Sequence, residues 1–421
     1  MSGMDLILRN ALLGDGASVD IGVADGRVAA IASSLEATGP EVDLGGRLVV
    51  PGFIETHLHL DKSCILDRCH SEKGSLDEAI AEVSRAKRQF TTADVFERAS
   101  RTLEKAIVQG TTHVRTHVEV DPGIGLRGFD AIKQLASAYR WAVDLEICVF
   151  PQEGLTNNPG TEELMREALA QGAGVVGAAP YTDPDPHGQI ERVFRMARDF
   201  DVDIDMHLDL GDSPDQMDAA FVCDMTERHR YAGRVTIGHV TKMSLLEPER
   251  FEQLARRLGE AGVAVTVLPS TDLYLMGRGQ RHSVVRGVLS AHELLNHGVN
   301  CSLSTNNVLN PFTPFGDCSL LRMANLYANV CHVGTRDGMR GCLDMVTNRS
   351  AKLLRLTDYG VETGKSADFV VLDCTTPEQG VAELAIPLCG FKRGRRTFTR
   401  SSVELHRPQY VNIQVSERNV D

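Results

Sequence analysis

Short apolar runs alternate with longer amphipathic stretches along most of this chain. Eight such runs lie near residues 50–56, 112–119, 143–150, 174–179, 203–208, 234–239, 263–268 and 299–305. They are short and rich in Val and Ile, which is typical of buried strands. The pattern therefore predicts eight strands separated by helical segments.

The amphipathic stretches between these runs predict helices. Clear examples cover residues 91–110, 128–140 and 213–229. In the last of these, Ser213 is the expected N-cap and Pro214 the expected first helical residue. Eight strands with intervening helices favour a closed parallel (β/α)8 barrel, a TIM barrel of α/β class, over a doubly wound open sheet.

The two ends of the chain have a different pattern. Residues 1–50 contain short alternating segments with Asp-Gly and Gly-Gly pairs, which form tight turns. The segments after residue 360 alternate in the same way. We expect residues 1–50 and 361–421 to form one small composite β-sandwich domain, and residues 51–360 to form the barrel.

Composition narrows the possible partners. A chain of 421 residues with 42% hydrophobic residues can bury a full core and is long for one domain. The net charge is −13 and no basic run is long enough to follow a phosphate backbone, so we expect no nucleic-acid partner. No stretch has the roughly 18 apolar residues of a membrane span, and the N-terminus lacks a signal-peptide pattern. We therefore expect a cytoplasmic protein that does not bind membranes, and we expect its ten scattered cysteines to be reduced thiols.

Histidines follow several of the predicted strands. His57 and His59 come at the end of the first strand, and the alternation of strand side chains puts both imidazoles on one side. His207 ends the fifth strand and His239 the sixth. Each could be an unrelated surface or rim histidine. Together, at one rim of a barrel, they predict a metal site with His57, His59 and His207 as ligands. His239 is expected to stand outside the ligand set and to orient or exchange protons with a bound water.

Several longer segments resemble the cytosine deaminase-like branch of the amidohydrolase superfamily, which includes N-isopropylammelide isopropylaminohydrolase. They are PGFIETHLHLDKS, VRTHVEVD, VFPQEG, the strand with His207, GHVT, LYLMGR, NPFTPFG and YGVETGKSADFVVLD. The match runs nearly from end to end. The combination of HLHLDK, FPQEG and GKSADFVVL is specific, whereas a single HxH motif is not.

This resemblance implies a distorted (β/α)8 barrel with one divalent metal ion, for which we expect zinc rather than iron or manganese. It implies that His239 is catalytic and that Gln152 and Phe312 bind a planar heterocycle, the amide offering a donor and an acceptor side by side. Lys62 either points into the pocket as a catalytic group or forms a salt bridge with Asp61 or another acid. Relatives of this architecture are commonly oligomeric, so we expect a homo-oligomer.

Two positions depart from the family pattern. The family's proton-shuttling Glu after the fifth strand is Leu210 here, and Leu210 cannot carry a proton. The family's Asp after the eighth strand, a metal ligand and base, corresponds to Asn306, whose carboxamide is neutral and not a base. We retain Asn306 as a substrate-binding candidate.

The sequence thus predicts an enzyme that hydrolyses a C–N bond of a small nitrogenous heterocycle with atypical proton transfer. The catalytic candidates are His239, Asp209 and Lys62, and Asp212 could also carry protons. Losing a general acid or base typically lowers a rate by about 10² to 10⁴. The alternatives are therefore a different reaction at the same metal site, such as hydration or isomerisation, or a non-catalytic protein that binds a metal or ligand.

Overall fold

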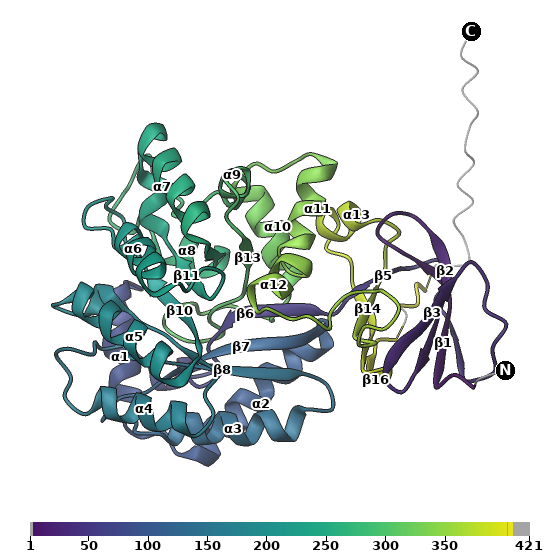
Figure 1. Cartoon of the computed structure of the whole chain (residues 1–421), viewed down its shortest axis with the longest axis horizontal. Coiled ribbons are helices and arrows are strands. Elements are labelled where there is room, and N and C mark those ends of the chain that lie inside the picture. The colour runs from purple at the N-terminus through teal and green to yellow at the C-terminus, as the bar shows by residue number, and fades with distance from the viewer. Residues whose placement is uncertain (1–2, 402, 407–421) are drawn as a thin grey trace, which may run out of the picture.

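The computed structural model describes residues 3–401 and 403–406, which form a barrel beside a separate sheet (Figure 1). The barrel has eight parallel strands that neighbour one another in chain order. They are β6 (Phe53–Leu58), β7 (Thr111–Glu119), β8 (Asp144–Phe150), β9 (Val175–Val176), β10 (Asp203–Leu208), β11 (Val235–His239), β12 (Val263–Val267) and β13 (Cys301–Leu303). Each coincides with one of the predicted runs, so the predicted barrel is confirmed.

The first and last strands meet through side chains and two backbone hydrogen bonds. Asn306 N–H donates to the carbonyl of His57 at 2.9 Å, and His59 N–H donates to the carbonyl of Asn306 at 2.8 Å. The buried carboxylate of Glu55 accepts from Ser304 Oγ at 2.5 Å and from the Thr305 side chain and backbone. This seam places Asn306 directly beside the two histidines of β6.

Helices surround the barrel (Figure 1). They are α1 (Leu76–Lys87), α2 (Thr92–Val108), α3 (Arg127–Tyr139), α4 (Thr161–Ala170), α5 (Pro186–Phe200), α6 (Ala219–His229), α7 (Pro248–Ala261), α8 (Pro269–Leu275), α9 (Ala291–Asn296), α10 (Leu320–Val330), α11 (Arg336–Asp344) and α12 (Asn348–Leu353), with the 3-10 turns η1 (Leu66–Arg68), η2 (Pro180–Thr182) and η3 (Thr241–Leu245).

The predicted start of the helix near residue 213 is wrong. Helix α6 begins at Ala219, and Ser213 Oγ bonds the carboxylate of Asp215 at 2.8 Å instead of capping a helix. The first N–H groups of the helix are satisfied by a distant side chain, because Asp209 accepts from Asp218 N at 2.8 Å and from Ala219 N at 3.1 Å. A carboxylate at this position also complements the helix dipole.

The second sheet contains eight strands contributed by both parts of the chain that flank the barrel (Figure 1). They are β1 (Leu6–Leu12), β2 (Ser18–Ala24), β3 (Arg27–Ala32), β4 (Glu41–Asp43), β5 (Leu48–Pro51), β14 (Phe369–Leu372), β15 (Pro387–Lys392) and β16 (Arg395–Thr399), with the short helix α13 (Pro377–Ala382) nearby. The two parts join where β5 pairs with β14, Val50 lying opposite Val370. The composite terminal unit predicted from the sequence is therefore present as one mostly antiparallel sheet, and residues 407–421 of the predicted unit lie outside the described residues.

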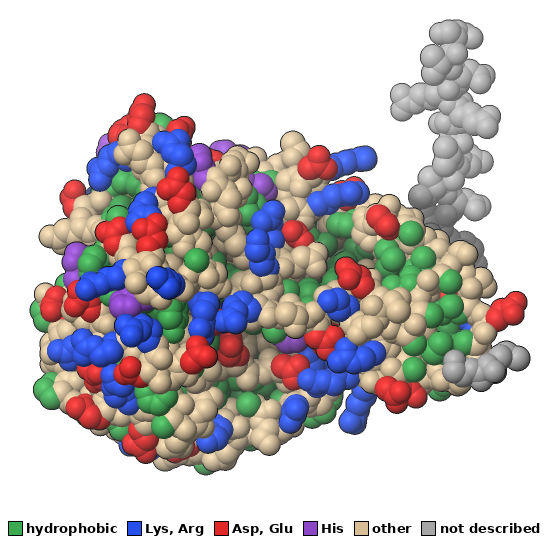
Figure 2. All heavy atoms as spheres, in the orientation of Figure 1, with side chains coloured by type: hydrophobic (Ala, Val, Ile, Leu, Met, Phe, Trp, Pro, Cys, Tyr) green, Lys and Arg blue, Asp and Glu red, His purple; other side chains and the backbone are tan. Residues whose placement is uncertain are grey.

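The visible surface of the barrel carries charges of both signs side by side (Figure 2). Lys and Arg side chains alternate with Asp and Glu rather than forming one basic stripe on this face. Among the described helices, none combines the length and the apolar character that crossing a bilayer requires.

Candidate metal centre and active site

The structure brings the three predicted ligands together at the carboxyl-terminal ends of the barrel strands. The Nε2 atom of His207 lies 3.0 Å from Nε2 of His57 and 2.9 Å from Nε2 of His59. All three side chains are buried. His57 in β6 packs against Gly238 in β11, where a Cβ atom would lie 3.2 Å from the imidazole. This close approach therefore depends on the glycine.

These imidazoles fit a divalent cation. Burial lowers the pKa of His57, His59 and His207 well below the usual value, so the rings are neutral and can act as ligands. Within the described chain their Nδ1 atoms have no hydrogen-bond partner, while the Nε2 atom of His207 lies within 3.0 Å of the Nε2 atoms of the other two rings. Neutral rings protonated at Nδ1 would leave these Nε2 lone pairs available to a metal.

A further histidine, His117, and a carboxylate, Asp205, lie next to this group. His117 in β7 stacks on His57 with ring centres 3.7 Å apart, and its Nε2 lies 3.4 Å from Oδ1 of the buried Asp205. Burial opposes ionisation of Asp205, but His117, His57 and Arg115 outweigh it and hold its pKa below the usual value. No role was predicted for Asp205 from the sequence. The strand alternation could have placed it at the site, because Asp205 precedes His207 by two residues in β10 and so lies on the same face of the strand.

His239 forms a dyad with the buried carboxylate of Asp272, to which no role was assigned from the sequence. Its Nδ1 lies 2.6 Å from Oδ1 of Asp272, and Oδ2 of Asp272 accepts from Leu268 N–H at 3.1 Å. On the other side of the ring, Nε2 lies 3.5 Å from Nδ2 of Asn306, whose Oδ1 is buried without a partner in the described chain. Burial raises the pKa of Asp272, an effect that His239 opposes.

Four residues at these strand ends have a left-handed backbone conformation. His239, Val240, Asp209 and Asn306 all have positive φ angles, at 71°, 50°, 48° and 65°. Non-glycine residues rarely adopt this conformation, and they cluster at functional sites where surrounding structure holds them in place. The two hydrogen bonds at the barrel seam hold Asn306 in this way.

Lys62 both points into the cavity and forms a salt bridge, the two placements that the sequence left open. Its side chain is buried, lines the cavity beside the histidines and pairs with Glu119 at 2.7 Å, rather than with Asp61. Its Nζ also donates to Oε1 of Gln152 at 3.0 Å and lies 4.3 Å from the ring centre of Phe312. The ammonium therefore occupies one face of the aromatic ring expected to cover the substrate.

A small cavity of about 10 Å³ lies among these groups. Its lining consists of His59, Lys62, Gln152, Tyr181, His207, Leu210, His239, Thr271, Leu275, Asn306, Asn307 and Phe312. This volume is far below the roughly 300–1,000 Å³ of pockets for drug-sized ligands, which favours a small ligand. Tyr181, Thr271 and Leu275 were not among the residues predicted to form the site.

His57 and Asp209 are the two predicted site residues that do not line this cavity, and Asp209 lies instead at the start of α6. Both carboxylate oxygens accept hydrogen bonds from the first backbone N–H groups at the start of α6. Burial raises the pKa of Asp209 to about 6, although these backbone groups oppose the shift. The structure thus gives Asp209 a helix-capping position, and its predicted catalytic role stays a prediction.

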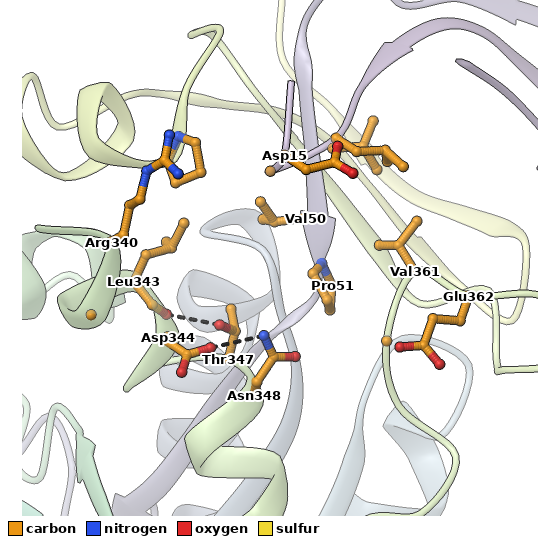
Figure 3. Close-up of a pocket in the computed structure, with 16 residues that line it drawn as sticks. Asp15, Val50, Pro51, Arg340, Leu343, Asp344, Thr347, Asn348, Val361 and Glu362 are labelled. Carbon is orange, nitrogen blue, oxygen red and sulfur yellow. Dashed lines mark hydrogen bonds between the residues drawn. The ribbon is translucent and has the colours of Figure 1, made fainter. Parts of the chain in front are cut away.

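A larger cavity, of about 660 Å³, lies between the small sheet and helices α11 and α12 (Figure 3). Its polar groups are largely engaged with each other, since Asn348 Nδ2 donates to Asp344 at 2.8 Å and Thr347 Oγ1 donates to the carbonyl of Leu343 at 2.8 Å (Figure 3). No histidine lines it. The chemistry predicted from the sequence therefore belongs to the smaller cavity.

The chain is similar to enzymes that act on nitrogenous rings. It is 28% identical to N-isopropylammelide isopropyl amidohydrolase of Pseudomonas sp. strain ADP, over 93% of this chain and 96% of the relative. It is 26% identical to pterin deaminase of Rhizobium rhizogenes, covering 84% and 81%. The crystal structure of 5-methylcytosine deaminase from Klebsiella pneumoniae with 5-fluorocytosine superimposes with a TM-score of 0.91 at 28% identity, covering 96% and 99%.

The family is established by a direct match. The model of the amidohydrolase family covers residues 48–401, and this chain belongs to that family. The resemblance proposed from the sequence segments is therefore confirmed, as is the prediction of an amidohydrolase-type enzyme. Members of the family use a divalent metal, and the buried His57, His207 and His239, whose ring nitrogens lie within 4.8 Å of one another, form a group that could bind one. His59 is not part of this group.

Proposed function

We propose that this protein is a metal-dependent amidohydrolase that hydrolyses a C–N bond of a small nitrogenous heterocycle. The observation that carries the proposal is the close approach of three neutral imidazoles, in which Nε2 of His207 lies 3.0 Å from Nε2 of His57 and 2.9 Å from Nε2 of His59, beside a small cavity that His59 and His207 line. The names of the relatives add support, because they describe hydrolysis or deamination of triazine, pterin and pyrimidine rings.

One divalent ion would be held by His57, His59 and His207. Three histidines with a fourth position open to solvent or substrate are typical of catalytic zinc, so we favour zinc over iron and manganese. When bound, such an ion lowers the pKa of a coordinated water from near 16 to about 7 and polarises the carbon that is attacked.

His239 supplies the base. Asp272 accepts the Nδ1 proton at 2.6 Å, so the unprotonated nitrogen is Nε2, which faces Asn306 at the cavity. That nitrogen can take a proton from the attacking water and return it to the leaving nitrogen, while Asp272 stabilises the imidazolium that forms between the two transfers.

Lys62 supplies positive charge next to the substrate. Its ammonium is fixed by Glu119 and Gln152, and it can stabilise negative charge that develops on the ring during attack. Leu210 forms part of the cavity wall, so the position of the family's glutamate is apolar here. We therefore assign proton transfer to His239 and electrostatic stabilisation to Lys62, and we give Asp209 a positioning role at the start of α6.

The test combines metal analysis with a substrate panel. Protein purified without added metal is expected to contain about one zinc, iron or manganese per chain. Cytosine, isoguanine, creatinine, pterin and amino-triazines are then scored for release of ammonia or amine. His239→Asn should retain the metal and lose turnover, whereas His207→Ala should lose both.

The exposed His187 gives a matched control, since His187→Ala should change neither property. Metal-loaded protein that binds these rings without converting them would support a non-catalytic binding protein. Conversion of a ring without release of ammonia or amine would support a different reaction at the same metal.

A further inference from the structure

The carboxylate of Asp205, inside the barrel, has its two oxygens in different surroundings. Oδ2 accepts from Nη1 of Arg115 at 3.0 Å, and Nε of Arg115 donates in turn to Glu146 at 2.7 Å. A guanidinium group stays charged and can only donate, so it holds Oδ2 on its own side. The other oxygen, Oδ1, is buried and has no hydrogen-bond partner among the described residues. This carboxylate therefore has one acceptor to spare.

Two imidazoles lie beside this second oxygen. Oδ1 of Asp205 is 3.4 Å from Nε2 of His117 and 3.8 Å from Nδ1 of His57. At 3.8 Å the contact is one of charge and dipole rather than a hydrogen bond. Nδ1 of His57 is itself buried without a partner in the part of the chain that the structure describes. A proton on this nitrogen is stabilised by the carboxylate, whereas a lone pair there would face negative charge.

The ring of His57 is held in one plane by its neighbours. The ring of His117 stacks on it with centres 3.7 Å apart and an angle of 22° between the two planes. A Cβ atom at Gly238 would lie 3.2 Å from both Cε1 and Nδ1 of His57, so the backbone of β11 lies against this edge of the ring. Turning the ring over in its plane would replace Nε2 by a carbon at the contact with His207. Only the present orientation therefore offers one nitrogen to the metal site and the other to Asp205.

Resting on the metal site of the proposed function, we propose that Asp205 is a positioning residue for the metal ligand His57. Its Oδ1 selects the tautomer that carries the proton on Nδ1, and this tautomer leaves the lone pair on Nε2 for the ion. Arg115 keeps Oδ1 on the histidine side by binding Oδ2. Histidines that bind metals commonly direct their other N–H at a carboxylate, and loss of such a partner typically weakens metal binding by about 10- to 100-fold.

Asp205→Asn tests this role because it keeps the shape of the side chain and exchanges one acceptor for a donor. Arg115 can only donate, so it would hold the oxygen of the new carboxamide and leave the NH2 group facing His57. A donor beside Nδ1 selects the tautomer protonated on Nε2, which has no lone pair for a metal. We expect the dissociation constant for zinc to rise by about 10- to 100-fold. Competition with a chromophoric chelator measures it.

Asp203→Asn is the matched control on the same strand. Asp203 accepts from Nε of Arg234 at 2.7 Å and from Nη1 of Arg355 at 2.6 Å, so this variant also takes a carboxylate away from arginine partners in β10. Its zinc affinity should equal that of the wild type. An equal loss of affinity in the two variants, or an unchanged affinity in Asp205→Asn, would overturn the role of Asp205.

A second measurement does not depend on whether Asp205→Asn folds. NMR spectra that correlate ring protons with ring nitrogens, recorded on metal-free protein labelled at histidine, show which nitrogen of each imidazole is protonated. The signals of His57 are identified by their absence from His57→Gln. We expect the wild-type ring to carry its proton on Nδ1 alone, and the ring in Asp205→Asn to carry it on Nε2. A wild-type His57 protonated on Nε2, or on both nitrogens, would contradict the proposal.

These outcomes are separable from those that test the proposed function. The tautomer is read without zinc and without turnover. Protein that takes up no zinc would contradict the proposed function, while the spectra would still decide whether Asp205 sets the proton of His57. An active zinc enzyme whose zinc affinity is unchanged in Asp205→Asn would contradict only the role of Asp205.

Discussion

The Nδ1 atom of His239 lies 2.6 Å from Oδ1 of Asp272, and both side chains are buried, that of His239 at the wall of the small cavity. A buried carboxylate thus contacts the histidine to which we assign the proton transfer, whereas Asn306 is a neutral amide at a position where the resemblance implies an acid. Asp272 contacts the proposed base, His239, through Nδ1, whereas Asn306 faces Nε2 of the same ring. Such a dyad holds the imidazole in one tautomer and stabilises its protonated form.

Asp272→Asn is expected to lower kcat by about 10² to 10⁴ with little change in zinc content. Leu268 N–H donates to the side chain at residue 272, which would turn the oxygen of the new carboxamide towards that N–H and its NH2 group towards His239. The imidazole would then have to carry its proton on Nε2, where it cannot act as a base. Steady-state kinetics and metal analysis test this. Asp373→Asn, at an exposed salt bridge with Arg47, is the control, and an unchanged kcat for Asp272→Asn would exclude the dyad.

Removal of the metal should lower the thermal stability of the protein. An ion that binds only the folded state adds about 2.7 kcal/mol when its free concentration is 100 times Kd. We therefore expect a chelator to lower the Tm of the wild-type protein and of His187→Ala, but to leave the Tm of His207→Ala unchanged. Differential scanning calorimetry with parallel metal analysis measures the effect. Wild-type protein that loses its metal without a change in Tm would contradict a histidine-bound ion coupled to folding.

Lys87 connects the acids behind Lys62. Its Nζ lies 2.8 Å from Glu119, 2.6 Å from Asp121 and 2.5 Å from Glu153. Burial alone would lower the pKa of Lys87, but these three acids outweigh it and raise the pKa. Burial alone would raise the pKa of Glu119, but Lys62 and Lys87 outweigh burial and lower this pKa. The pKa of Glu153 is raised, by burial first and then by Glu119.

Lys87→Met should therefore destabilise the protein in a pH-dependent way. Removing one partner of a buried ion pair typically costs about 3–5 kcal/mol, and we expect this loss near pH 8. Without Lys87 the pKa values of Glu119 and Glu153 in the folded state should rise. A carboxyl whose pKa is raised on folding contributes stability below its pKa in the unfolded chain. It loses this contribution as the pH rises through its pKa in the folded state. The loss should thus be smaller near pH 5.5. Urea unfolding at both pH values, with the exposed Lys133→Met as control, measures it. A loss that is larger at the lower pH would show that these acids stay ionised.

Much of the fold was predictable because the information is local. Buried strands of a parallel barrel are short runs of Val and Ile, and the alternation in β6 places His57 and His59 on one face without any tertiary information. The start of α6 was not predictable, since Ser213 and Pro214 satisfy the local rules for a helix start. The group that caps the helix is Asp209, which the end of β10 brings from nine residues before Asp218.

The hydrogen-bonding state of the site was also beyond the sequence. Gln152 could be assigned to the site by resemblance, but the atom that it offers to a ligand depends on Lys62, 90 residues away in the chain. The direction of Asn307 depends on Asn310, whose Nδ2 donates to Oδ1 of Asn307 and whose oxygen accepts from the backbone N–H of Phe312. Such relays are set by the packed loops and not by the identity of the residue.

Asn306→Asp tests whether this site is a weakened version of the family's usual one or has a chemistry of its own. An aspartate here would place a second carboxylate beside the imidazole of His239, whose Nε2 lies 3.5 Å from Nδ2 of Asn306, while Asp272 holds Nδ1. Two acids on one imidazole favour its doubly protonated form, which has no free nitrogen to act as base. The new carboxylate would also be an additional ligand for the ion. We therefore expect slower loss of zinc to a chelator and a kcat lower by about 10-fold or more.

Asn329→Asp, at an exposed position of α10, is the charge-matched control. The measurement is kcat as a function of pH. The decrease should be accompanied by an upward shift of the acidic limb of the kcat–pH profile, because a second carboxylate stabilises the protonated form of the base. A rise in kcat, in Asn306→Asp alone or together with Leu210→Glu, would instead mean that the two replacements weaken an otherwise ordinary deaminase site. It would also make the His239–Asp272 dyad unnecessary as the source of the base.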